Sequence, residues 1–388
     1  MPTSSDAIVV GVDIGTTGTK ACAVDGHGAL LARAYYSYSI CSPCPSWAEQ
    51  DPKGIWEAVV AAIKEVVACL SAKEQTISAL SLSSAFHSLI AIDAAGSPIS
   101  PSLTWADNRS ATYAAKLRSA DTGGALSART GLPLLPMSPL TKLVWMKDHQ
   151  RGLFEAAKGF ISIKEYVLEQ LTGERLTDLT MASATGLFDV RKHRWDDEAL
   201  SIAGITTRHL PTFVEPTTVV PHLRKIVADY LGVPTQLPVV VGAGDGLLAN
   251  IGSGAVGIGK ANLTIGTSLG LRSVLPAPYS DPHGKNICYA VTNNRWLVGY
   301  AGSSGGIVLD WMSRLFGLED DKVGRAELMD KALRLTPGAD GLICLPYIVG
   351  ERAPNRDAAA KGAFVGMRID HGREHYWRAA LEGMFLVA

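Results

Sequence analysis

Short apolar runs alternate with turn residues at the beginning of the chain. The segment from Ile8 to Val12 is a β-branched run that ends at Asp13, and further runs cover Lys20 to Val24 and Ala29 to Ala34. Glycine and threonine separate the first two runs, and Asp25-Gly26 follows the second. Runs of this length bounded by turn residues predict a meander of three strands.

A helical pattern follows this meander. Asp51-Pro52 offers an N-cap and a proline at the first helical position. Strand patterns come next, at Ile77 to Leu82 and at Leu89 to Ile92. Because strands and helices alternate, we expect an α/β fold. The apolar residues that recur at helical spacing are Ile55, Val59, Val60, Ile63, Val66, Val67 and Leu70.

The opening unit recurs in weaker form in the second half. Pro238 to Gly242 has the composition of a buried strand. Later, Leu263-Thr264-Ile265 leads into Gly266-Thr267-Ser268 and out through Leu269 to Val274. Two such phosphate-sized turns indicate a duplicated protein that binds its ligand between two lobes. We place the boundary near residue 240, with one domain over residues 1–240 and a second over 241–388.

Composition and charge narrow the class of partner. The 388 residues, 47% hydrophobic and 19% charged, suit a folded chain of two domains. The 36 lysines and arginines nearly cancel the 37 aspartates and glutamates, which argues against nucleic acid and anionic membranes as partners. The first apolar run has no basic segment before it and breaks at Asp13, so neither a signal peptide nor a membrane span fits. We expect a cytoplasmic protein with a small-molecule partner.

Three short motifs are weak evidence for chemistry. Residues 254–261 nearly match GxxxxGK[ST], but Ala261 lacks the magnesium-binding hydroxyl. Residues 252–257 match GxGxxG. Both segments would connect a helix to a strand, which is the reverse of the required context. Cys41 and Cys44 form a CxxC in a proline-rich segment without a second ligand pair, so coincidence in a loop is favoured over metal or redox chemistry.

The DIGTTGTK segment at 13–20 has a better context, because it follows a strand directly. Asp13 at the strand end is placed to hold a magnesium ion, directly or through water, since carboxylate oxygens suit this cation. Gly15, Thr16, Thr17 and Gly18 would form a tight turn whose N–H groups and hydroxyls point at phosphate oxygens. A plain hairpin turn is the alternative, and the matching turn at 266–268 counts against it.

Nine segments along essentially the whole chain share an order and spacing. They are DIGTTGTK, WAEQDPKGIW (47–56), SSAFHSLIAID (83–93), TWADNRS (104–110), ISIKEYVLEQLTGE (161–174), GAGDGLLANIGSG (242–254), TIGTS (264–268), GGIVLDW (305–311) and GERAPNRD (350–357). In this order they resemble the FGGY family of carbohydrate kinases, and TWADNRS, MASATGLFD (181–189) and ISIKEYVLEQLTGE resemble its gluconokinase branch. The resemblance implies an actin-like, ribonuclease H-like ATPase fold of two duplicated lobes with a cleft between them. It also implies transfer of a phosphoryl group from ATP, with Mg²⁺, to a hydroxyl of a sugar or sugar acid.

The family's catalytic and phosphate-binding residues can be placed on this sequence. Asp245 in GAGDG matches the catalytic base, which accepts the proton of the attacking hydroxyl. Read without the family, Asp245 would be equally suited to cap a helix. Asp13 matches the aspartate near the metal. The first phosphate loop would comprise Gly15, Thr16, Thr17, Gly18 and Lys20, and the second Gly266, Thr267 and Ser268.

The resemblance also implies sugar-pocket residues, namely Phe86, His87, Trp105, Asp107, Arg109, Lys164 and Asp245. Phe86 departs from the methionine common at its position. A lone histidine such as His87 is more often structural than a ligand. Arg109 can pair a sugar-acid carboxylate or lock Asp107 in place. Lys164 is a candidate anion contact or a solvated helix lysine.

The sequence ends at Ala388 within REHYWRAALEGMFLVA, which has helical composition and no stop signal. The resemblance implies a further glycine-rich segment that holds adenosine, so we expect the second lobe to be incomplete. Gluconate to 6-phosphogluconate is the leading reaction, with a homodimer as candidate assembly. The alternatives are a xylulokinase-like ketose kinase and a truncated sugar-binding module without turnover. An actin-like chaperone or filament ATPase does not account for the pocket segments from Ser83 to Ser110.

Overall fold

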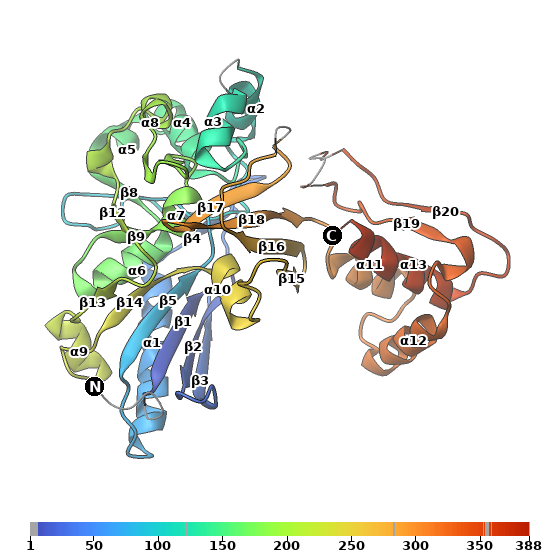
Figure 1. Ribbon diagram of the computed structural model, residues 1–388, viewed down its shortest axis with the longest axis horizontal. Coiled ribbons are helices and arrows are strands. Elements are labelled where there is room, and N and C mark those ends of the chain that lie inside the picture. Colours follow the sequence, from blue (N-terminus) through green and yellow to red (C-terminus); the bar gives the residue numbers. More distant parts are fainter. Residues whose placement is uncertain are drawn as a thin grey trace. The chain divides into compact units, whose positions relative to one another are not determined.

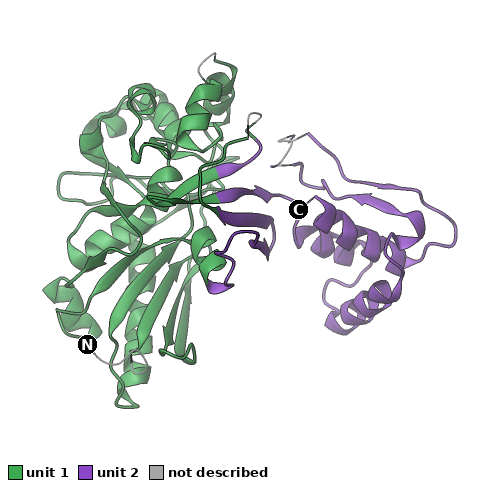
Figure 2. Cartoon of the chain, viewed as in Figure 1, with its two compact units in different colours: residues 1–251, 275–284, 288–297 green, residues 252–274, 285–287, 298–388 purple. Residues whose placement is uncertain are grey.

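The computed structural model describes residues 7–120, 123–281, 284–351, 353, 357 and 359–387 (Figure 1). Most of the RAPNR stretch in the GERAPNRD segment therefore lies outside the described residues. The chain forms two compact units (Figure 2). Unit 1 comprises residues 1–251, 275–284 and 288–297, and unit 2 comprises residues 252–274, 285–287 and 298–388. The proposed boundary near residue 240 remains a prediction, and in this division Asp245 lies in unit 1.

Unit 1 is built on a mixed six-stranded sheet. β1 is antiparallel to β2, and β2 to β3, so the predicted meander is confirmed. β1 runs parallel to β5 and β5 runs parallel to β14, while β13 is an antiparallel edge strand. The strands, in sheet order, are β13 (Val219–Val220), β14 (Val239–Gly244), β5 (Ala79–Ser84), β1 (Val9–Ile14), β2 (Gly18–Val24) and β3 (Leu30–Ser37).

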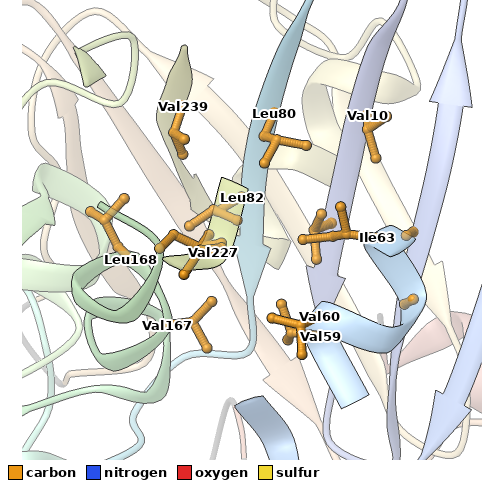
Figure 3. Packing of buried hydrophobic residues seen from close by; sticks show 14 of the residues in the cluster. Val10, Val59, Val60, Ile63, Leu80, Leu82, Val167, Leu168, Val227 and Val239 are labelled. Carbon is orange, nitrogen blue, oxygen red and sulfur yellow. The ribbon is translucent and has the colours of Figure 1, made fainter. Parts of the chain in front are cut away.

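The core of unit 1 lies between this sheet and three helices, α1 (Pro52–Ser71), α6 (Ile163–Thr172) and α9 (Lys225–Leu231) (Figure 3). The predicted start of α1 is confirmed, because the Asp51 carboxylate accepts the N–H groups of Lys53 at 3.0 Å and Gly54 at 3.2 Å. Each fully buried aliphatic side chain stabilises the fold by about 1.5–3 kcal/mol. Completely buried members of this core include Val10, Val59, Ile63, Leu80, Leu82, Val167 and Val239.

Smaller elements surround the sheet of unit 1. Four two-stranded sheets pair β4 (Glu49–Gln50) with β7 (Ser102–Leu103), β6 (Ile90–Ile92) with β8 (Gly159–Ile161), β9 (Leu176–Asp178) with β12 (Thr212–Val214), and β10 (Phe188–Asp189) with β11 (Arg194–Trp195). The helices are α2 (Ala111–Ser119), α3 (Gly123–Thr130), α4 (Pro139–His149), α5 (Arg151–Ala156), α7 (Leu179–Ser183), α8 (Asp197–Ala203), α10 (Asp245–Gly252) and the 3₁₀ turn Thr207–His209.

A second sheet has the order β15-β16-β18-β17, with β15 at Ala261–Ile265, β16 at Leu269–Leu275, β17 at Ile287–Thr292 and β18 at Arg295–Gly302. The strand, turn, strand unit predicted around residue 266 is therefore confirmed. The GxGxxG and GxxxxGK segments follow α10 and precede β15, as expected. Residues 298–388 of unit 2 contain α11 (Ile307–Leu315), α12 (Lys322–Arg334), a 3₁₀ turn (Ala339–Gly341), α13 (Arg373–Leu386) and the paired strands β19 (Ile343–Leu345) and β20 (Ala363–Val365). Within the described ranges, no helix combines the length and apolarity that a membrane crossing needs.

Candidate active site

Three parallel strands of unit 1 end at one edge of the sheet and bring distant parts of the sequence together. Asp13 on β1 is in register with Ser83 on β5, and Ser83 is in register with Ala243 on β14. Asp245 begins α10 directly after β14. Neighbouring strands lie about 4.8 Å apart, so the backbones of β1 and β14 are roughly 10 Å apart here. The carboxyl ends of parallel strands are where ligands of open α/β sheets bind.

The first Gly-Thr-Thr turn is held by side chains that contact its carbonyl groups. Tyr38 donates its hydroxyl to the Gly15 carbonyl at 2.7 Å, and the Gln50 amide donates to the Thr16 carbonyl at 2.7 Å. The Tyr35 hydroxyl donates to the Thr17 carbonyl at 3.2 Å. In the described part of the chain, neither the Thr16 nor the Thr17 N–H donates to a protein acceptor. The turn therefore has carbonyls bound by the protein and two backbone donors available to an anion.

Asp13 is a half-buried carboxylate with one oxygen engaged. Its Oδ1 accepts a hydrogen bond from the Ser83 hydroxyl at 2.7 Å. Lys20 is its antiparallel partner on β2 and points an exposed side chain to solvent. A carboxylate that is partly open to solvent is a suitable ligand for a hard cation such as Mg²⁺, which keeps several of its water ligands.

Glycines let the backbone before Asp245 lie close to its neighbours. Gly242 has φ of +69°, and a Cβ there would lie 1.8 Å from the Leu82 carbonyl oxygen. A Cβ on Gly244 would lie 2.0 Å from the Phe86 ring. Only glycine fits these two positions. Gly242 has a left-handed conformation, and at both positions the backbone lies too close to its neighbour for a side chain. The ring of Phe86 thus packs directly on the backbone that precedes the exposed Asp245.

A buried polar network fixes this backbone from the other side. The Gly244 N–H donates to the Thr180 hydroxyl oxygen at 3.0 Å. That hydroxyl donates to Asp178, whose second oxygen accepts from the Lys164 ammonium. Lys164 and Asp178 are 2% and 0% exposed, so they form a buried ion pair. The interpretation of Lys164 as a solvated helix lysine is wrong, because its charge lies inside the fold and holds the aspartate. Its role as an anion contact remains a prediction.

On the expectation that Asp245 is the catalytic base, Thr180→Val should lower turnover with little change in sugar affinity, because it removes the acceptor for the Gly244 N–H and so displaces Asp245. A displacement near 1 Å at a reacting group can cost about 10²-fold in rate. Steady-state kinetics with Thr180→Ser, which keeps the hydroxyl, should show near wild-type turnover. Thr172→Val serves as the control, because it removes a buried hydroxyl that bonds the Leu168 carbonyl of α6 and the nearby Glu174 N–H. Equal effects of the two valine variants would contradict this role.

Phe86 and His87 are fixed by a tyrosine from β17. The ring centroids of Phe86 and Tyr289 are 5.1 Å apart. His87 Nδ1 lies 2.7 Å from the Ala184 carbonyl oxygen and Nε2 lies 3.1 Å from the Tyr289 hydroxyl. Because a carbonyl only accepts, Nδ1 carries a proton and donates it to the Ala184 carbonyl. His87 also has φ of +68°, an uncommon conformation for this residue type.

The TWADNRS segment contributes one residue to the turn and a buried ion pair beside it. Trp105 Nε1 donates to the Thr16 hydroxyl at 2.9 Å. Arg109 binds both oxygens of Asp107 through Nε, at 2.9 and 3.0 Å, and bonds Glu49 through Nη2. The guanidinium also lies 3.7 Å from the Trp47 ring centroid. Of the two roles considered for Arg109, the structure shows the one that locks Asp107, with the Arg109 side chain 1% exposed.

A cavity of about 10 Å³ lies beneath this arrangement. Gly15, Thr16, Phe86 and Trp105 all line it, so four of the predicted site residues share one space in unit 1. A volume of this size accommodates about one water molecule.

The second Gly-Thr-Ser turn lies in unit 2, between β15 and β16. Its Gly266 N–H donates to the Ser268 carbonyl at 2.9 Å, whereas the Gly15 N–H of the first turn donates to the Gly18 carbonyl, one residue further along. The Gly306 N–H donates to the Gly266 carbonyl at 2.7 Å and joins the turn to the start of α11. Gly266 and Thr267 line a pocket of about 430 Å³ within unit 2.

Comparison with known proteins identifies the family. Residues 8–252 match the N-terminal domain, and residues 261–388 the C-terminal domain, of the FGGY family of carbohydrate kinases. The chain belongs to this family. Its members are phosphotransferases with an alcohol acceptor and use ATP as the phosphoryl donor, which confirms the predicted class of enzyme.

The relatives of this FGGY kinase include gluconokinases and xylulose kinases. It is 39% identical over 383 residues to a gluconokinase of Bacillus subtilis, covering 97% of this chain and 74% of that protein. It is 30% identical to a xylulose kinase of Klebsiella pneumoniae, with 97% and 76% covered. The solved structure of a gluconate kinase from Lactobacillus acidophilus matches with a TM-score of 0.92 and 33% identity, over 98% of this chain and 76% of that one. These neighbours confirm the predicted actin-like α/β fold.

Four residues that contact the candidate site were not predicted from the sequence. They are Asp178, Thr180, Tyr289 and Lys142, whose ammonium group bonds the His87 and Thr104 carbonyls. Lys142 had a local signal, because it stands among the apolar residues of the helical segment PLTKLVW. Tyr289 lies in an ordinary strand pattern, and only the fold brings it to His87.

Proposed function

We propose that this kinase phosphorylates gluconate to 6-phosphogluconate with ATP and Mg²⁺. The observation that supports the proposal is the parallel pairing of β1 and β14 with β5 in unit 1, because β1 carries Asp13 and leads into the first turn and β14 leads into Asp245. The name of the Bacillus subtilis relative supports gluconate as the acceptor. The roles of the individual residues, a cytoplasmic location and a homodimer all remain proposals.

In the proposed reaction Asp245 acts as the general base. The substrate hydroxyl oxygen attacks the γ-phosphorus, the bond from that phosphorus to the β-phosphate oxygen breaks, and the hydroxyl proton passes to the Asp245 carboxylate. The N–H groups of Thr16 and Thr17 hold phosphate oxygens. Asp13 would hold Mg²⁺ through its Oδ2, and the bound ion would neutralise phosphate charge. Most of the catalysis comes from positioning and charge stabilisation.

The pocket within unit 2 is a second candidate site for a nucleotide. Gly266 and Thr267 line one part of it, and Arg325 supplies a cation. The Trp377 side chain also lines the pocket.

A coupled assay that follows ADP release tests the substrate. We expect turnover with D-gluconate and ATP. The kcat/KM for D-gluconate should be at least about tenfold higher than that for D-xylulose, since discrimination by polar contacts is worth several kcal/mol. Phosphorylation of xylulose without gluconate would transfer the assignment to the ketose kinases, which the Klebsiella pneumoniae relative represents.

A binding module without turnover is the second alternative. Calorimetric titration with ATP separates it from a kinase, because a module would bind the sugar and give no heat with ATP. Binding of both ligands with turnover would eliminate this alternative.

A further inference from the structure

Lys142 on α4 is an internal lysine whose side chain is completely buried. Its ammonium nitrogen lies 2.8 Å from the His87 carbonyl oxygen, 2.7 Å from that of Thr104 and 3.5 Å from that of Leu103. In the described part of the chain, no carboxylate forms an ion pair with it. A charge buried in this way needs acceptors for its three protons, and these carbonyls supply them.

The three carbonyls belong to two segments that separate at this point. Leu89 and Leu103 form an antiparallel bridge, with N–H to carbonyl distances of 3.0 and 2.9 Å. Beyond the bridge, one segment continues to His87 and the other to Thr104, and the direct pairing between them ends. Lys142 replaces the next backbone pairing between the two segments, because its ammonium group bonds a carbonyl of each segment.

Both segments lead into the proposed sugar site. His87 follows Phe86, whose ring packs on Gly244 before Asp245. Thr104 precedes Trp105, which bonds the Thr16 hydroxyl of the phosphate turn. The left-handed conformation of His87 stores strain that its surroundings must hold, and Lys142 bonds the carbonyl of this very residue.

We propose that Lys142 is a positioning residue of the sugar site, and that its ammonium group fixes the separation between the His87 and Thr104 segments. This inference rests on the proposed function, because it assumes that these two segments contact the sugar. It adds a residue from α4 that touches neither substrate nor nucleotide.

The charge state of Lys142 matters for this role. Burial lowers the pKa of Lys142 to about 7; Asp107 opposes the shift and Arg109 adds to it. Asp107 and Arg109 are paired with each other, and Arg109 also bonds Glu49. The ammonium form donates three hydrogen bonds, whereas the neutral amine donates only two. Sugar binding should therefore weaken as the pH rises through about 7.

Isothermal titration with D-gluconate and with D-xylulose tests the proposal. Lys142→Met should raise the dissociation constant of the sugar that the wild type binds by about tenfold or more, because the pocket segments lose their shared anchor. Lys147→Met, an exposed position on the same helix, is the matched control and should bind like the wild type. Equal affinity of folded Lys142→Met and wild type would overturn the inference.

A pH series gives a second readout. Between pH 6 and 9 the sugar affinity of the wild type and that of Lys147→Met should fall by the same factor. The sugar affinity of Lys142→Met should not show this decrease. If Lys142→Met does not fold, a wild-type affinity that stays constant over this range would overturn the inference. Binding of neither sugar by the wild type would reject the proposed function and this inference with it, whereas wild-type binding with an unaffected Lys142→Met rejects the inference alone.

Discussion

Asp245→Asn is expected to lower the turnover number of the kinase by about 10²-fold or more, the usual contribution of a general base. The amide cannot accept the proton of the attacking hydroxyl. The transition state therefore loses stabilisation, whereas the complex with bound substrate does not. The affinity for gluconate should stay within about twofold of the wild-type value, because contacts made equally in the bound substrate and in the transition state are kept. Steady-state kinetics for turnover and calorimetry for binding separate the two effects.

Asp229→Asn is a suitable control for this experiment. Asp229 lies on α9 and forms an exposed ion pair with Lys225, away from the edge that carries Asp13. This variant should retain wild-type turnover and binding. Near-normal turnover of Asp245→Asn would remove Asp245 from the role of base, and equal loss of sugar binding and turnover would make it a binding residue instead.

Lys164→Met is expected to have the largest effect on stability. The substitution leaves the Asp178 carboxylate buried without its cation, and breaking a buried ion pair from one side costs about 3–5 kcal/mol. For a unit of this size the melting temperature should fall by roughly 6–20 °C. Differential scanning calorimetry at pH 7 measures the shift, and the transition that moves should be that of unit 1.

Two further variants sharpen this test. Lys164→Met combined with Asp178→Asn should be more stable than the sum of the single effects predicts, because the second change removes the unpaired charge. Lys225→Met breaks an exposed pair whose side chains are 81% and 62% accessible, and surface pairs contribute at most about 1 kcal/mol. A melting temperature of Lys164→Met as high as that of Lys225→Met would contradict the buried-pair account.

The ion pair also connects stability to catalysis. Lys164 holds Asp178, Asp178 holds Thr180, and Thr180 accepts the N–H of Gly244 immediately before Asp245. Stabilising contacts and the position of the proposed base thus share one network. We therefore expect the turnover of Lys164→Met to fall by more than its fraction of folded protein does.

Local features of the chain were readable from the sequence alone. The meander, the capped helix α1 and the turn at Gly266 follow from periodicity, the Asp51-Pro52 start and turn residues, all of which act over a few neighbouring positions. The family followed from motifs along the chain. Helix α10 shows a limit of this reading, because whether Asp245 serves as a cap or a base depends on what the folded chain brings near it.

The tertiary structure alone decided which charges are buried and what they bind. Lys164 looked like a surface lysine until its partner, 14 residues away, was placed beside it in the core. Arg109 could face a substrate until Glu49, 60 positions earlier, occupied its guanidinium. Desolvation and ion pairing depend on every element packed around a side chain, whereas propensity and capping depend on its neighbours in the chain. For that reason the sequence determined the family and the local elements, and the fold determined the role of Lys142.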